Sequence, residues 1–254
     1  DKDEPLMNRN LWLLVAAQGL FLTNNVTFIA INGLVGLSLA PLEWMATLPV
    51  MGYVVGGALS TGPVAWSQAR WGRKLSFQLG LAVALLSSLL CAFAVIEKNF
   101  WLLVLATVIA GYYSANGQLY RFAAAELSKP AYREKAVSMV LAGGLVGAVI
   151  GPNLATWTRH LIGAPFAGAY AALAAVAMLS MLMLAFIRFP PVPPKKQAAS
   201  GGRPLAEIMR QPVFIVSAAA AALGYGVMNL LMAATPIAMQ QHHHSFESTA
   251  LVLE

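Results

Sequence analysis

The stretch that decides the fold is VFIVSAAAAALGYGVMNLLMAATPIAM, residues 213–239. It is a long apolar run without a single charged side chain. A helix needs about 20 apolar residues to cross the hydrocarbon core of a bilayer. Backbone polar groups at that depth must be satisfied within the segment itself, which a helix does. The run therefore predicts a membrane-spanning helix.

Six similar runs precede it, at residues 11–37, 44–67, 75–96, 100–122, 136–157 and 166–189. Only 10% of the residues are charged, 59% are apolar and the mean hydropathy is +0.68. A soluble domain would be about a quarter charged. A cleaved leader in the first run is disfavoured, because the apolar part of a leader has only about 7 to 15 residues. The composition predicts an all-α integral membrane protein.

The basic residues alternate between loops. Of the 16 Lys and Arg residues, all but Lys98 and Arg159 lie in the N-terminal tail and in every second loop after it. By the positive-inside rule, this asymmetry predicts a multi-pass protein with a cytoplasmic N-terminus. The net charge of +6 therefore indicates membrane topology and lipid contact, and does not indicate a nucleic-acid partner.

The composition changes at residues 190–212, which are rich in Pro, Lys, Gly and Ser. This is typical of a linker, and the charge pattern makes it cytoplasmic. It divides a bundle of six helices, residues 1–189, from residues 213–254. The latter hold the seventh helix and, from near Ser248, the start of an eighth.

Polar side chains recur within the spans. On the first span Gln18, Asn25 and Asn32 are seven residues apart, which places them on one helix face. Tyr113 and Asn116 share a face of the fourth. Such faces indicate either a central substrate cavity or hydrogen bonding between helices. We expect the first span to face the seventh across such a cavity.

Rows of small residues at four-residue spacing mark packing faces. Gly52 and Gly56 form such a row on the second span, and Gly143, Gly147 and Gly151 form one on the fifth. Small side chains let two helix backbones approach closely. These rows therefore predict close helix contacts.

A basic motif lies between the second and third spans. Residues 65–74, AWSQARWGRK, resemble the G-x-x-x-D-R-x-G-R-R/K signature of the major facilitator superfamily. The positions that match are Arg70, Gly72, Arg73 and Lys74, while Ala65 and Ala69 replace the Gly and the Asp. Members of that family have twelve helices in two halves, with the substrate site between them. The resemblance implies the N-terminal six-helix bundle plus the first helix of a C-terminal bundle, whose remainder would be a partner.

The same resemblance implies a cytoplasmic gate. In the family the basic residues of this motif latch the two halves together, partly through a carboxylate after the fourth helix, for which Glu126 is the candidate. Anchoring of Arg70, Arg73 and Lys74 to anionic lipid is the alternative. A third possibility, a membrane scaffold without transport, follows if the natural chain ends at Glu254.

The sequence favours a solute transporter over an enzyme. None of its ten carboxylates lies at the middle of a span. No paired acids and no nucleophile beside a histidine are present, so neither catalysis nor a cofactor is expected.

Methionines on the seventh span point to a substrate. Met228, Met232 and Met239 lie within about 40° of one face, and thioethers are soft ligands suited to Cu(I). Residues 242–244, all histidines, follow at the end of the span. Methionine is also a common filler of helix interiors, which is the alternative.

Met228 and Met232 resemble the M-x-x-x-M element of the CcoA-type copper importers. That resemblance implies copper as the transported substrate, a role in supplying cytochrome oxidase assembly, and a place in the bacterial inner membrane. The partner H-x-x-x-M of that family would lie beyond Glu254. The alternative is efflux of drug-like molecules by proton antiport. It follows from residues 147–152, GAVIGP, which resemble the antiporter pattern G-x-x-x-G-P, and from Tyr112 and Tyr113.

Overall fold

A computed structural model describes residues 8–191 and 203–253, and within these ranges the fold is all helical. Two short 3-10 turns occur, at Glu43–Met45 and Pro130–Tyr132. The α-helices are α1 (Arg9–Leu39), α2 (Leu48–Ile96), α3 (Phe100–Gly117), α4 (Tyr120–Leu127), α5 (Arg133–Thr158), α6 (Ala167–Ala185), α8 (Leu205–Met209), α9 (Pro212–Gln241) and α10 (Phe246–Leu253). The predicted all-α membrane fold is confirmed, while most of the predicted linker lies outside the described residues.

Helix α2 contains two of the predicted spans. Its 49 residues would extend over roughly 74 Å, more than twice the thickness of a bilayer core. The helix breaks at Gly72, which has φ 83° and ψ 170°, a conformation that glycine adopts readily and other residues do not. The sequence predicts a loop at residues 65–74, and it is shorter than predicted, because helical structure continues on both sides of Gly72.

The predicted fourth span ends earlier than expected. Helix α3 stops at Gly117, and the short helix α4 begins at Tyr120 and continues to Leu127. At the break, the missing side chain of Gly117 leaves room for the ring of Phe21 from α1. The apolar run of residues 100–122 is thus one long helix followed by a turn and the start of another.

Two pairs of helices pack closely, α1 with α5 and α2 with α3. A Cβ atom on Gly147 would overlap the carbonyl oxygen of Gly19, and one on Gly56 would overlap that of Val108. The Thr23 hydroxyl links the first pair by donating to the Gly147 carbonyl oxygen of α5 at 3.3 Å, and it also donates to the Gly19 oxygen of its own helix at 2.9 Å. The rows of small residues are confirmed as packing faces.

The bundle has two ends. One end contains Gly72, the first residues of α1, and helix α4. There the Asn8 side chain donates to the Leu127 carbonyl oxygen at 3.2 Å. We call this the Gly72 end. The other, called the Lys98 end, joins the last residues of α1 and α2, the turn between α5 and α6, and α10.

Exposed tryptophans mark both ends. All six tryptophans are at least 44% exposed. Aromatic side chains of this kind gather where a membrane meets water. At the Gly72 end they are Trp12, Trp66 and Trp71, and at the Lys98 end they are Trp44, Trp101 and Trp157. Six described helices are long and apolar enough to cross a membrane, and the break in α2 makes seven crossings, as the sequence predicts.

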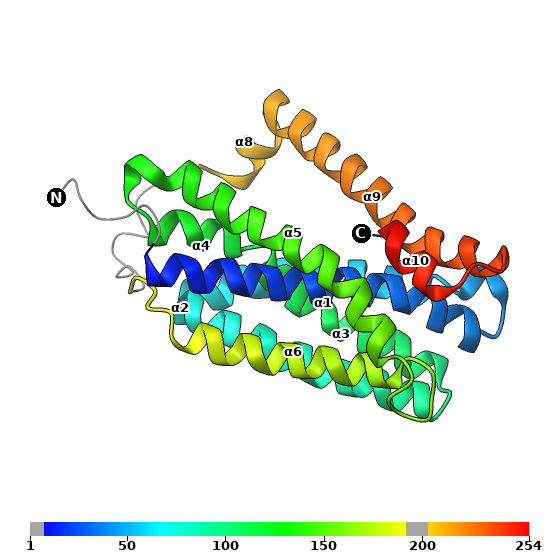
Figure 1. The fold of residues 1–254 in the computed structure, drawn as a ribbon. Helices are drawn as coiled ribbons and strands as arrows, with labels where there is room; N and C mark the ends of the chain where they lie inside the picture. The colour runs from blue at the N-terminus through cyan, green and yellow to red at the C-terminus, as the bar shows by residue number, and fades with distance from the viewer. Residues whose placement is uncertain (1–7, 192–202, 254) are drawn as a thin grey trace.

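Helix α9 meets the bundle over part of its length only. It packs mainly against α1, and its buried residues are Asn229, Ala233 and Pro236. In Figure 1 it joins the bundle where α1 finishes and lies apart from it toward α8. At the contact, a Cβ atom on Gly33 would lie 3.1 Å from the Ala233 carbonyl oxygen. The expected cavity between the two helices is therefore absent there, and α1 and α9 touch directly.

Candidate transport site and gate

The polar stripe of α1 is tied to two tyrosines on other helices. The Tyr53 hydroxyl on α2 donates to Asn25 Oδ1 at 2.7 Å, and the Tyr170 hydroxyl on α6 donates to Asn32 Oδ1 at 2.5 Å. The ring of Phe28 contacts both phenols, with centroids 4.8 and 6.1 Å away. Two of the predicted cavity residues therefore also connect helices.

Hydrogen-bonding capacity is left over in the same region. Asn32 Nδ2 is buried without a partner among the described residues, and so is the oxygen Oδ1 of Asn229 on α9. Further atoms of this kind on α1 are Gln18 Oε1, Asn24 Nδ2 and Thr27 Oγ1. A buried polar group without a partner costs about 1 to 3 kcal/mol. These atoms do not form one cluster, because Thr27 Oγ1 lies next to Gly151 of α5 whereas Asn229 is on α9.

Tyr113 and Asn116, the other predicted cavity residues, lie inside the helix bundle. Asn116 Oδ1 accepts a hydrogen bond from Ser76 at 3.0 Å, and its Nδ2 donates to the Tyr112 carbonyl oxygen at 3.1 Å. The ring of Tyr113 packs edge-on against Phe21, with centroids 5.4 Å apart. Of the two readings that the sequence left open, these contacts support hydrogen bonding and packing between helices.

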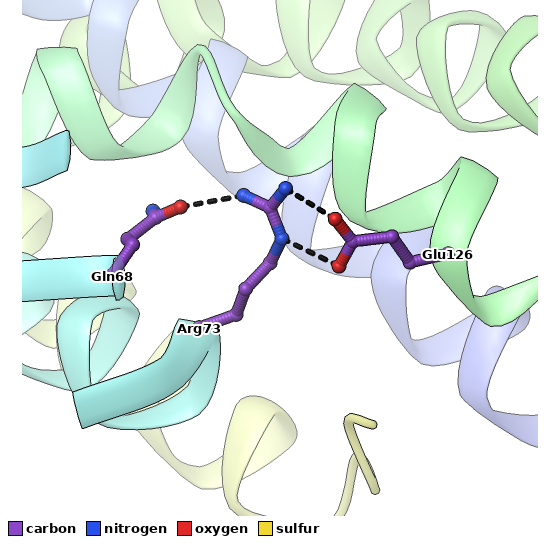
Figure 2. A network of polar contacts seen from close by, with 3 residues as sticks. All are labelled: Gln68, Arg73 and Glu126. Atoms are coloured by element: carbon purple, nitrogen blue, oxygen red, sulfur yellow. Dashed lines mark hydrogen bonds and ion pairs between the residues drawn. The ribbon is translucent and has the colours of Figure 1, made fainter. Parts of the chain in front are cut away.

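The predicted gate residues Arg73 and Glu126 form an ion pair. Arg73 Nε and Nη2 donate to the two carboxylate oxygens at 2.7 and 2.6 Å, and Nη1 donates to Gln68 Oε1 at 2.5 Å (Figure 2). Such a fork-to-carboxylate pair fixes orientation as well as charge. Gln68 was not predicted, although an amide directly before Ala69, where the family has its Asp, was a usable signal.

The other basic residues of the motif have different partners. Lys74 Nζ donates to the Ala185 carbonyl oxygen at the end of α6, at 2.6 Å. The Arg70 guanidinium is exposed and lies over the Trp66 ring, 5.5 Å from its centroid. Arg70 is thus free to meet lipid or another helix, whereas Arg73 is already paired.

The three methionines of α9 are spread along the helix. Met232 is partly buried against the apolar core, and Met228 is 41% exposed. The 11 residues from Met228 to Met239 cover roughly 16 Å of helix, so these thioethers cannot all bind one ion. In the described ranges no group of three or more His, Cys, Asp or Glu side chains could hold a metal ion. At most the two neighbouring thioethers of Met228 and Met232 could bind the same copper ion.

The described carboxylates all lie near helix ends or in turns, and none lies in the middle of a long helix. Glu126, as described above, is paired with Arg73. The full set in the described ranges is Glu43, Glu97, Glu126, Glu134, Glu207 and Glu247. The buried unpartnered side-chain atoms of α1 and α9 in the described ranges thus belong to neutral amides and hydroxyls.

The helix arrangement and the motif at Gly72 agree with a match to a family model. The model of the Major Facilitator Superfamily covers residues 11–253, and the chain belongs to this superfamily. Membership agrees with the transporter class that the sequence predicts, and this class is not one of enzymes.

Individual relatives narrow the comparison. Over 254 residues, 99% of this chain and 64% of the relative, the chain is 37% identical to the riboflavin transporter RfnT of Brucella anthropi. It is 25% identical over 154 residues, 61% of this chain and 35% of the relative, to the uncharacterized MFS-type transporter YddS of Bacillus subtilis. The chain thus spans less than two thirds of these relatives. The expected kinship with CcoA-type copper importers gains no support from them.

A solved structure gives the same fold. The crystal structure of a D-xylose-proton symporter aligns with a TM-score of 0.66 and 17% identity, covering 96% of this chain and 64% of that one. At this identity the likeness concerns the fold alone.

Proposed function

We infer that the chain is the N-terminal part of a secondary transporter for a flavin-like solute, a neutral planar ring system rich in hydrogen-bonding groups. The observation that carries this proposal is 37% identity to a riboflavin transporter along 99% of the chain. In the proposed arrangement, residues 1–189 form the N-terminal bundle, 190–212 a cytoplasmic linker, and 213–254 the start of the second bundle.

The chemistry between α1 and α9 suits such a solute. Asn32 offers an unpartnered amide nitrogen and Asn229 an unpartnered amide oxygen. A flavin ring presents alternating carbonyl and N–H groups along one edge, and a side-chain amide can both donate to and accept from such an edge. The described site offers no charge at this depth, which favours a neutral solute over an ion.

In this proposal the pair Arg73–Glu126 positions the gate residues from within the N-terminal bundle, because both side chains belong to residues 1–189. It lies at the Gly72 end, which the charge rule places in the cytoplasm. At that end α9 stands apart from the bundle, whereas near the other end it packs against α1 (Figure 1). The arrangement therefore corresponds to a transporter open toward the cytoplasm.

Copper import and drug efflux fit the described residues less well than transport of a flavin-like solute. Met232 packs against the core, so copper would have to displace an apolar contact to bind it. The antiporter-like glycines at 147 and 151 approach α1 directly and have a packing role.

Riboflavin uptake by the full-length protein tests the proposal. A bacterium that can neither make riboflavin nor import it should grow on low riboflavin when the gene is supplied, and should accumulate radiolabelled riboflavin. Asn229→Leu should reduce this uptake at an unchanged membrane level. The tertiary packing should survive this change, because among the described residues the side chain of Asn229 donates only to Tyr225 O, in its own helix. Absence of uptake by a wild-type protein present in the membrane would overturn the proposal.

A further inference from the structure

A cavity lies at the Lys98 end, and Leu34 of α1 and Pro236 of α9 are among its lining residues. Its volume is about 920 Å³, and it is enclosed by the ends of α1 and α2, the turn between α5 and α6, and the α9–α10 turn. The walls are largely apolar, with Phe166 and Phe246 among them. Lys98, Arg159 and His244 are also among the lining residues.

The cavity carries positive charge without a matching negative one. No Asp or Glu side chain is among its lining residues. Within the described ranges, neither Lys98 nor Arg159 has a carboxylate within 4.0 Å, and Arg159 Nε is buried without a hydrogen-bond partner. Glu97 and Glu247 adjoin the cavity in sequence and are exposed, as are Lys98 and His244, whereas Arg159 is partly buried. Desolvating a cation without a counter-charge is costly, so an anion in the cavity would be stabilised.

The cations are held in position. The Arg159 guanidinium lies 4.7 Å from the ring centroid of Phe246, which in turn packs edge-on against Phe166 at 5.4 Å. Lys98 and Phe166 have positive φ values of 52° and 66°, which side chains other than glycine rarely adopt. At Lys98 this conformation terminates α2, with the Asn99 N–H donating to the Ala94 carbonyl oxygen at 2.8 Å, and it fixes the backbone from which the Lys98 side chain extends.

We propose that this cavity binds a phosphate or carboxylate attached to an apolar or aromatic body. Arg159 and Lys98 pair with the anionic group, and Phe166 with Phe246 contacts the body. Arg159 and Phe166 belong to the first six spans, whereas Phe246 and His244 follow the seventh. An anion bound between them favours the arrangement in which these two parts touch at the Lys98 end. The ligand is either a soluble organic anion or the headgroup of an anionic lipid.

Binding of 1-naphthyl phosphate, with 1-naphthol as its neutral counterpart, tests the proposal. The full-length protein is placed in nanodiscs of phosphatidylcholine, and binding is followed by calorimetry. We expect saturable binding of the phosphate, weak binding of the naphthol, and at least a tenfold loss of phosphate affinity in Arg159→Gln. Arg121→Gln is the matched control, because Arg121 also lies over a ring, that of Phe122 at 5.1 Å.

A second variant guards against misfolding. Lys98→Asn removes the other cation, and asparagine tolerates a positive φ. It should also weaken the binding of 1-naphthyl phosphate. Equal binding of phosphate and naphthol, or unchanged affinity in folded Arg159→Gln and Lys98→Asn, would overturn the proposal.

Anionic lipid separates the two sources of the ligand. If phosphatidylglycerol in the nanodisc competes with 1-naphthyl phosphate in the wild type, and the Arg159→Gln variant retains no such competition, the site takes a lipid headgroup. If phosphatidylglycerol leaves the affinity unchanged, the site takes a soluble anion. Either result supports an anion site.

Discussion

Arg73 donates from Nε and Nη2 to both carboxylate oxygens of Glu126, at 2.7 and 2.6 Å, and so joins the helix after the Gly72 break to α4. The Arg73 side chain is 22% exposed and that of Glu126 is 45% exposed. A pair this open to solvent stabilises the fold by at most about 1 kcal/mol. Its contribution is therefore expected in the balance between conformations more than in the stability of the fold.

Glu126→Gln should slow uptake while leaving thermal unfolding nearly unchanged. A loss of about 1 kcal/mol from a two-state equilibrium shifts it roughly fivefold, and uptake kinetics would report that shift. Glu134→Gln, which removes an exposed carboxylate from the first turn of α5, is the control and should behave as wild type. Equal uptake by the two variants would show that the pair Arg73–Glu126 has no role in gating.

Gly147→Val should prevent the normal packing of α5 on α1. The added Cβ would overlap the Gly19 carbonyl oxygen, which is backbone and cannot move aside as a side chain can. Overpacking of this kind typically costs about 1 to 3 kcal/mol. The measurement is the thermal midpoint of the purified protein in detergent. Gly62→Ala is the control, because no atom lies within 4 Å of its added Cβ, and it should leave the midpoint unchanged or higher.

Tyr170→Phe should destabilise the bundle by about 1 to 3 kcal/mol, since it leaves Asn32 Oδ1 buried without its donor. Tyr112→Phe is the matched control, because the structure shows no hydrogen bond from the Tyr112 hydroxyl in the described ranges. Denaturation in detergent compares the two. A midpoint for Tyr170→Phe equal to that of Tyr112→Phe would show that the hydroxyl bond contributes nothing.

The predicted topology can be checked by cysteine labelling in whole cells. Cys91, the single cysteine of residues 1–254, should stay unlabelled because it is buried, and any cysteine outside these residues is first replaced by serine. With a cytoplasmic N-terminus, Leu42→Cys should react with a membrane-impermeant maleimide, and Ala131→Cys should react only after the cells are opened. Both positions are exposed. The reverse pattern of labelling would invert the topology.

Met228→Leu combined with Met232→Leu should leave riboflavin uptake unchanged, since leucine conserves the apolar volume next to the core. Radiolabelled copper and radiolabelled riboflavin are measured on the same cells. Copper uptake by the wild type that disappears in this double variant would restore the copper hypothesis.

The spacing of apolar residues was enough to predict the seven crossings, because each run is long enough for a bilayer. Glycine spacing likewise predicted the contact of Gly147 with α1. The hydrogen-bond partners of the polar stripe could not be predicted from the sequence, because Tyr170 lies 138 residues from Asn32 along the chain and Tyr53 lies 28 residues from Asn25. Which amide meets which phenol depends on how three helices pack, and no local pattern encodes that.

The extent of helical structure around Gly72 was also missed. Basic residues such as Arg70 and Lys74 suggested a loop, yet their long side chains extend to a ring and to a helix end while the backbone stays helical. Charge marks where a chain leaves the membrane, and it does not mark where the helix ends.

The contact between Gly33 and Ala233 also provides a point about which α9 can tilt. The helix is 30 residues long, roughly 45 Å, and its buried side chains are confined to Asn229, Ala233 and Pro236. If α9 tilts about this contact, the backbone at Ala233 moves little, and the start of the helix at Pro212 moves much further. A side chain larger than hydrogen at position 33 would push α9 away from α1 at Ala233. It would change the tilt of α9 without contacting the solute.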